Sequence, residues 1–322
     1  MPDITKHPVI ELIKKRAKEG SKPGKRKDTF KVGLIVEGGA LRGVVSAAEL
    51  RALQLMGFRD SFDVIYGESV GAGNAAWFMS LQIDKAIAVY WTLINNHAFL
   101  NPLRLLLGRS LMDNDFLNQQ VEEHFPISFD EFKASGIILN VLAARVDKPK
   151  NQKGVYEPEI VISDFPNKDT LISALRGGIQ EPFISGDPYP FAGMELWDVG
   201  ILDKLPVQKA INDGCTHILT ATCCPIDYQP VKQHAFTVPI VRAYINTYSS
   251  ELADHYIRTA ERYRETLDFL RQKQLDYKRE PFVAMLALPR GTKRLSDFEI
   301  RAHVLQEEAK LAEENTRRVF LD

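Results

Sequence analysis

Short apolar runs alternate with amphipathic segments along most of this chain. Six of the runs have the length and apolar composition of buried strands, and the segments between them have the apolar spacing of helices. Strands that alternate with helices predict an α/β fold, in which a mostly parallel central sheet carries helices on both faces. The expected strands are 31–36, 62–66, 136–144, 156–162, 217–223 and 281–288, and the expected helices are 8–19, 44–56, 70–79, 84–94, 173–178, 206–212, 240–273 and 296–318.

Residues 31–81 form one predicted strand–helix–strand unit. The first strand runs into a glycine-rich loop at 37–43, and the helix at 44–56 leads to the second strand at 62–66. The two strands should be parallel, with a right-handed crossover between them. The loops that follow both strands then emerge at one edge of the sheet, where open α/β folds bind their ligands.

The second of these loops carries the sequence G-E-S-V-G at 67–71. A G-x-S-x-G sequence between a strand and a helix is typical of a nucleophile elbow, in which glycines permit a tight turn and leave the serine hydroxyl accessible. We expect the backbone N–H groups of Gly38 and Gly39 to face Ser69 and to bind the oxyanion of an acyl-transfer intermediate. The competing interpretations are a small residue in a tight turn, and glycines needed only for close packing.

The composition is that of an ordinary globular protein. Of the 322 residues, 45% are apolar and 26% are charged. The three cysteines, at 215, 223 and 224, predict neither a disulfide framework nor a metal site, and they fit a reducing compartment. No apolar run has the length of a transmembrane helix, and the first residues lack the apolar core of a secretory signal.

Positive charge collects at the N-terminus, although the net charge of the chain is only −1. Residues 1–31 contain ten lysines and arginines against four acidic residues. We therefore expect a cytoplasmic protein, with peripheral contact between residues 1–28 and anionic membranes as one hypothesis. The alternative is a solvated, disordered arm.

Three blocks of the sequence resemble the patatin-like phospholipases. Residues 37–43, EGGALRG, are similar to the family's glycine-rich oxyanion block, and residues 67–75, GESVGAGNA, match its nucleophile elbow. Residues 197–207, WDVGILDKLPV, resemble the block that carries the family's aspartate base. A short helix and a Pro-Phe loop at 174–183 also lie where the family has them. The resemblance covers roughly residues 31–225.

This resemblance implies a three-layer α/β/α lipid acyl hydrolase with a Ser–Asp dyad and no catalytic histidine. Ser69 would attack the ester carbonyl, Asp198 would accept the serine proton, and amides near Gly38, Gly39 and Ala40 would bind the oxyanion. The implied substrates are acyl esters of lipids such as phospholipids, and no cofactor, metal ion or nucleic acid is expected. An aspartate with an ordinary pKa of about 3.9 is a poor base at neutral pH unless burial raises that pKa.

The aspartate block departs from the family pattern at Val199, where the family has glycine. If this position required a positive φ, a β-branched residue there would be strained and Asp198 would be held less tightly. Asp203 is a rival for the role of base. His217 or His234 would complete a Ser–Asp–His triad in the chain order of the α/β-hydrolases.

Other residues are expected to support the site, namely Gly67, Gly71, Gly200 and Arg42. Arg42 is either a charge behind the oxyanion loop or a solvated residue at the start of a helix. The leucine-rich run at 100–107 either lines an acyl-chain site or packs in the core and a lid, and the core is favoured.

We expect three parts in the chain: a basic helix and linker at 1–30, a catalytic domain at 31–240, and a mainly helical region at 241–322 packed on it. The alternatives to a lipid acyl hydrolase are a short-chain esterase or thioesterase, and a non-catalytic lipid-binding protein that keeps the fold. Nucleotide binding is disfavoured, because Ala40 replaces a fingerprint glycine and Val44 replaces the P-loop lysine.

Overall fold

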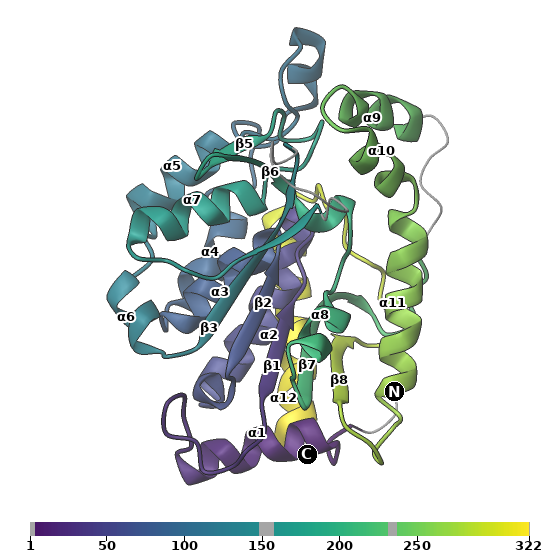
Figure 1. Ribbon diagram of the computed structural model, residues 1–322. Coiled ribbons are helices and arrows are strands. Elements are labelled where there is room, and N and C mark those ends of the chain that lie inside the picture. The colour runs from purple at the N-terminus through teal and green to yellow at the C-terminus, as the bar shows by residue number, and fades with distance from the viewer. Residues whose placement is uncertain (1–3, 148–157, 231–236, 322) are drawn as a thin grey trace.

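The computed structural model describes residues 4–147, 158–230 and 237–321. These residues form one eight-stranded sheet in which β3, β2, β1, β7 and β8 are parallel neighbours in that order (Figure 1). Three antiparallel strands complete it beside β3, so the predicted α/β class with a mostly parallel sheet is confirmed. The strands are β1 Val32–Val36, β2 Val64–Glu68, β3 Ile138–Arg145, β4 Glu159–Ile162, β5 Tyr189–Phe191, β6 Met194–Asp198, β7 His217–Pro225 and β8 Phe282–Leu288.

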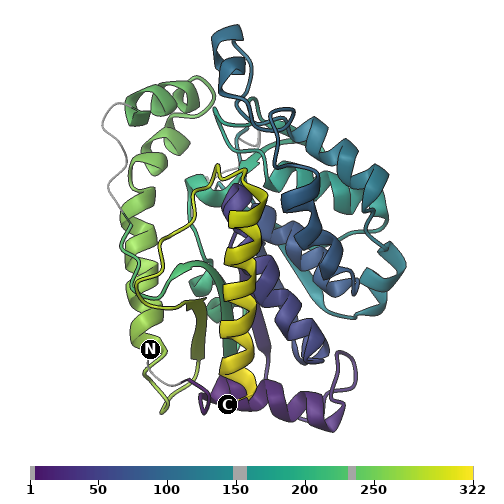
Figure 2. The ribbon, with the colours of Figure 1, turned by 180° about the vertical axis from the view of Figure 1, so that it is seen from behind.

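Helices cover both faces of this sheet (Figures 1 and 2). One face carries α2 Val44–Leu55, α3 Val70–Met79, α4 Ile83–Thr92 and α12 Ala302–Leu321, and the other carries α8 Val207–Asn212 and α11 Thr259–Lys273. The remaining helices are α1 Pro8–Glu19, α5 Asn114–His124, α6 Phe129–Ala134, α7 Lys168–Gly178, α9 Thr237–Asn246 and α10 Ser250–Ile257, with short 3-10 helices η1 Ala40–Gly43, η2 Arg59–Ser61, η3 Pro102–Leu107 and η4 Val199–Ile201.

The two cores explain why the central strands are apolar at every position. Successive side chains of a strand point to opposite faces of the sheet. Leu34 and Val36 of β1 accordingly pack in the core under α2 and α3, whereas Ile35 packs in the core under α11. A parallel strand buried on both faces reads as a continuous apolar run, which is the pattern at 31–36.

Several predicted boundaries shift because local capping overrides the apolar pattern. The helix expected at 240–273 is three helices, since the Ser249 hydroxyl accepts a hydrogen bond from the N–H of Leu252 at 3.3 Å and starts α10. The helix expected at 173–178 is only the second half of α7. Part of the strand expected at 156–162 lies outside the described residues, and β4 forms its end.

The N-terminal helix α1 is built into the molecule, so the alternative of a solvated arm is wrong. Val9 and Ile13 are fully buried in the core. Arg16 is also fully buried, and its guanidinium lies 2.7 Å from the carboxylates of both Asp28 and Asp63. Figure 1 places α1 at the end of the sheet where β1 begins. Membrane contact through residues 1–28 stays a prediction.

The leucine-rich run is not core, which corrects the favoured expectation for 100–107. Leu100 is buried, but Leu103, Leu106 and Leu107 are 67%, 83% and 76% exposed. They belong to η3, none of whose residues is buried. Figure 1 shows this segment, coloured blue, projecting beyond the opposite end of the sheet from α1.

Candidate active site

Ser69 lies at the turn between β2 and α3, at the carboxyl end of the parallel strands. Its φ of 53° and ψ of −137° lie outside the regions that side-chain-bearing residues prefer. Two glycines make so sharp a turn feasible. A Cβ on Gly67 would overlap Ala72, and a Cβ on Gly71 would overlap the carbonyl oxygen of Val36. The strand-to-helix turn therefore has the geometry of a nucleophile elbow.

The glycine loop after β1 approaches Ser69 directly. A Cβ on Gly38 would lie 2.5 Å from Ser69 Cβ and 3.2 Å from its Oγ, so a side chain there would displace the hydroxyl. Gly39 has a φ of 138° and Ala40 a φ of 50°, and the chain then enters η1. Across the described part of the chain, the N–H groups of these three loop residues donate no hydrogen bond to the protein. They are therefore available to a substrate oxygen.

Strand pairing brings Asp198 to the same place. Strand β4 occupies one edge of β3. Strands β2 and β6 therefore pair with successive parts of the other edge of β3. Glu68, the last residue of β2, pairs with Leu142, and Asp198, the last residue of β6, pairs with Ala143. Asp198 therefore lies beside the residue that precedes Ser69, although the two are far apart in sequence.

The Asp198 carboxylate is buried, and the Ser69 hydroxyl lies close enough to stabilise its charged form. Burial raises the pKa of Asp198 above the ordinary aspartate value. The Ser69 hydroxyl, the Gly200 N–H at 2.8 Å from Oδ1 and the charge of Lys204 lower this pKa without cancelling the rise. A raised pKa brings a carboxylate closer to the range in which it can act as a base.

Val199 does not strain the aspartate block. It begins η4 and has no positive φ, and its side chain is buried in the core under α11. The strain that a β-branched residue would suffer in a left-handed conformation therefore does not arise. The next residue, Gly200, is the tight position, because a Cβ there would lie 3.2 Å from Asp198 Oδ1 and 3.6 Å from Glu68 Oε1.

The buried carboxylate of Glu37 anchors the glycine loop at its start. Its Oε2 accepts a hydrogen bond from the N–H of Cys223 at 2.6 Å, and its Oε1 accepts one from the Tyr263 hydroxyl at 2.6 Å. Cys223 belongs to β7 and Tyr263 to α11. The Glu37 carbonyl oxygen also accepts a hydrogen bond from the Ser46 hydroxyl at 2.8 Å.

Arg42 holds the loop from its other end. Its side chain is buried, and a Cβ on Gly39 would overlap its guanidinium. It forms an ion pair with Asp297, whose carbonyl oxygen accepts a hydrogen bond from the N–H of Leu41 at 3.1 Å. The interpretation of Arg42 as a solvated residue at the start of a helix is therefore wrong.

Glu68 is a further buried acid at the site. Its Oε2 accepts a hydrogen bond from the N–H of Leu205 at 3.2 Å. Burial raises the pKa of Glu68 to about 8, Lys204 opposes this rise, and the charges of Glu37 and Asp198 add to it. The raised pKa favours the protonated form of Glu68 at neutral pH, which reduces the negative charge beside Asp198.

Residues 34–211, more than half of the chain, match the family described as patatin-like phospholipase. The chain belongs to the patatin-like phospholipase family. It is also similar to "Uncharacterized protein YjjU" of Escherichia coli (strain K12), with 26% identity over 198 residues, which are 61% of this chain and 52% of that protein. The chain thus spans about half the length of this relative.

The matched family is one of phospholipases, and the match ends before two of the residues that hold the site. Tyr263 and Asp297 lie beyond the matched region and in none of the three sequence blocks. Glu68 and Lys204 lie within the blocks, but nothing else in the sequence indicates that they belong to the site. Burial and long-range pairing reveal all four.

The histidine alternatives do not gain support in this patatin-like chain. His217 begins β7, at the opposite end of the strands from Ser69, and packs against the rings of Phe30 and Phe282 with centroid separations of 4.8 and 5.2 Å. Burial lowers its pKa to about 4. A triad through His217 is therefore excluded by the fold. His234 lies outside the described residues.

Asp203 lies in a different environment from Asp198. Burial raises its pKa to about 6, and its charged neighbours are Glu159 and Arg262. It lines a pocket between β4 and α11, and its side chain forms no hydrogen bond with Ser69. The geometry thus favours Asp198 over Asp203 as the partner of Ser69.

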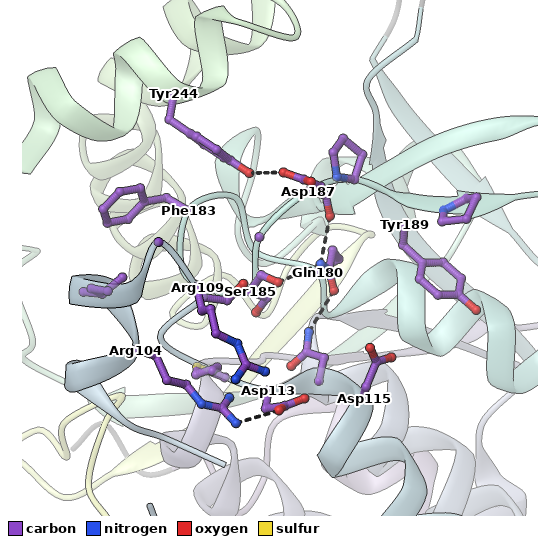
Figure 3. Close-up of a pocket in the computed structure, with 18 residues that line it drawn as sticks. Arg104, Arg109, Asp113, Asp115, Gln180, Phe183, Ser185, Asp187, Tyr189 and Tyr244 are labelled. Atoms are coloured by element: carbon purple, nitrogen blue, oxygen red, sulfur yellow. Dashed lines mark hydrogen bonds and ion pairs between the residues drawn. The ribbon is translucent and has the colours of Figure 1, made fainter. Parts of the chain in front are cut away.

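Two cavities lie near this end of the sheet. A polar cavity of about 610 Å³ separates η3 from α9 (Figure 3). Arg104 and Asp113 form an ion pair of 2.7 Å on one side of it, and the Tyr244 hydroxyl donates a hydrogen bond to Asp187 at 2.9 Å on the other. A narrow apolar cavity of about 70 Å³ begins at the first turn of α3; its lining includes Val70, Gly73, Trp77, Val89, Leu117, Val121, Ile172, Leu175 and Ile179.

In residues 4–147, 158–230 and 237–321, no helix is both long and apolar enough to cross a membrane. The same residues contain no group of three or more His, Cys, Asp and Glu side chains that could hold a metal ion. The expectations of no cofactor and no metal remain predictions.

The raised pKa of Glu68 predicts a specific pH dependence of stability. As pH rises from about 4.5 to about 8, the unfolded chain releases the Glu68 proton while the folded chain keeps it, so ionisation favours unfolding. Glu68→Gln should remove this contribution, up to about 1.4 kcal/mol per pH unit, from the free energy of unfolding measured in urea. The exposed substitution Glu265→Gln is the control. Equal slopes in the wild type and Glu68→Gln would contradict the assignment.

Proposed function

We propose that this chain hydrolyses acyl esters of lipids, with Ser69 as nucleophile and Asp198 as base. One observation carries the proposal: a buried carboxylate lies beside a serine that is held on an elbow and faces backbone N–H groups without protein partners. Membership of a lipid-acting hydrolase family supports the substrate class.

In the proposed reaction the Ser69 hydroxyl attacks the ester carbonyl while Asp198 takes its proton. The N–H groups near Gly38, Gly39 and Ala40 bind the oxyanion of the tetrahedral intermediate, and their fixed positions avoid reorganisation during the step. Asp198 then protonates the departing alcohol. In the second half, Asp198 removes a proton from the water that attacks the acyl-enzyme. It passes this proton to Ser69 Oγ as the bond to the acyl group breaks, which releases the fatty acid and restores the free serine.

The apolar cavity supports lipid acyl chains over short acids. Its lining starts at Val70, the residue after Ser69, and continues along one side of α3 through Gly73 and Trp77. An acyl chain bound there would leave its carbonyl carbon near the Ser69 hydroxyl. The apolar lining of this cavity suits the hydrocarbon part of a lipid ester better than a polar substrate.

A non-catalytic lipid-binding protein is the competing proposal. The feature that favoured it was Val199, and the structure removes the strain on which that argument rested. The interactions of Glu37 and Arg42 also hold the glycine loop against Ser69, as catalysis requires.

The proposal is tested by removing the base. Asp198→Asn keeps an acceptor for the Gly200 N–H but cannot take a proton, so kcat for a chromogenic acyl ester should fall by about 10²–10⁴. His217→Gln should stay within a few-fold of wild type. The acid limb of the wild-type kcat/KM profile should lie above the ordinary pKa of aspartate, because burial raises that of Asp198. Comparable losses in both variants, with intact folds, would contradict a Ser–Asp dyad.

The acyl-chain assignment predicts a length-dependent effect at Gly73. This residue lies one helical turn after Ser69 and lines the apolar cavity. Gly73→Leu should fill the cavity and lower kcat/KM for long-chain nitrophenyl esters by about tenfold or more, while acetyl ester hydrolysis changes little. Gly73→Ala is the matched control, since its Cβ would meet Trp77 at an ordinary 3.6 Å. Equal losses for short and long esters would show that the cavity does not bind the acyl chain.

A further inference from the structure

The segment η3 exposes apolar side chains that the proposed catalytic site does not use. Leu105, Leu106 and Leu107 are consecutive and all exposed, and Leu103 joins them one turn earlier. We call these four residues the leucine tip. Exposed apolar clusters of this kind mark surfaces that bind a partner or a membrane.

The chain segment that carries the leucine tip has only basic charges, whereas Asp113, Asp115 and Asp187 line the cavity beside it. The sequence from 85 to 112 contains no aspartate or glutamate, and the cations nearest the tip in sequence are Arg104 and Arg109. Arg104 is paired with Asp113, at the inner side of the segment, whereas Arg109 is exposed. Leucines flanked by arginine fit a surface whose interior is apolar and whose boundary is anionic.

The position of the tip also points to a lipid surface. It projects from the end of the molecule at which the parallel strands β1 and β2 end, on the side of Ser69 (Figure 1). Helix α9 reaches the same end and exposes Ile240, with Tyr248 exposed just after it (Figure 1). A membrane that contacts both segments would lie over the end of the sheet that holds the proposed nucleophile.

The arrangement of the leucines favours a bilayer over a protein groove. A helix that docks in a groove presents one apolar face, with contacts spaced three or four residues apart. Here three successive residues are exposed, and successive residues of so tight a turn point in different directions. Only a surrounding apolar medium would bury all of them.

We infer that the leucine tip inserts into the surface of anionic lipid membranes and brings the site at Ser69 to its substrate. The inference rests on the proposed function for the source of lipid, but binding can be measured without turnover. It differs from the hypothesis of contact through residues 1–28, because α1 lies at the other end of the sheet (Figure 1).

The test compares two double variants of the whole chain. Leu106→Ser with Leu107→Ser removes the two most exposed leucines of the tip. Leu55→Ser with Leu321→Ser removes two exposed leucines at the ends of α2 and α12, away from the tip. Each protein is sedimented with vesicles of equimolar phosphatidylcholine and phosphatidylglycerol, and assayed on those vesicles and on a water-soluble acetyl ester. Light scattering records the oligomeric state.

The tip variant should bind vesicles about tenfold more weakly or worse, and its vesicle hydrolysis should fall in parallel, because burial of exposed leucines drives insertion. Its acetyl ester activity should match wild type, and the control variant should behave as wild type throughout. Unchanged vesicle binding in the tip variant would overturn the inference. So would a wild-type oligomer that dissociates only in the tip variant, since the leucines would then contact a second copy. Leucine-dependent binding without hydrolysis of any ester would refute the proposed function alone.

Discussion

The site depends on the close contact between two strand ends. β1 and β2 are adjacent and parallel, so the loop after one must pass directly over the turn after the other. The contact at Gly38 leaves no room for a Cβ beside Ser69, and the turn itself leaves none at Gly67 or Gly71. The glycines of the two motifs thus prevent steric overlap at the same place, around Ser69. They let unpaired backbone N–H groups approach the serine hydroxyl, as the proposed binding of a developing oxyanion requires.

Parts of the chain outside the matched family region hold this contact in place. The Glu37 carboxylate accepts a hydrogen bond from the hydroxyl of Tyr263 in α11, and Arg42 forms an ion pair with Asp297 in the segment before α12. Because Glu37, Tyr263 and Arg42 are buried, loss of the partner of any one of them would leave an uncompensated polar group near the glycine loop. The predicted division at residue 240 remains a prediction, but the region beyond it supplies contacts that the loop requires.

The sequence predicted what local pattern and motif determine. The unit at 31–81, the elbow at Ser69 and the fold class all follow from apolar periodicity and glycine placement. It did not predict partners that meet only through long-range strand order, such as Glu68 with Leu205 or Glu37 with Tyr263. It also misjudged exposure, because an apolar run such as the one at 100–107 has the same composition whether it is buried or projects into solvent.

The most direct test of the account is the site of covalent capture. The wild-type chain would be treated with a fluorophosphonate, which reacts with activated serines, and digested for mass spectrometry. The account predicts a single adduct on the peptide that contains Ser69, and protection from labelling by a long-chain acyl ester. Labelling at another serine, or none under conditions where the chain hydrolyses esters, would contradict Ser69 as the nucleophile.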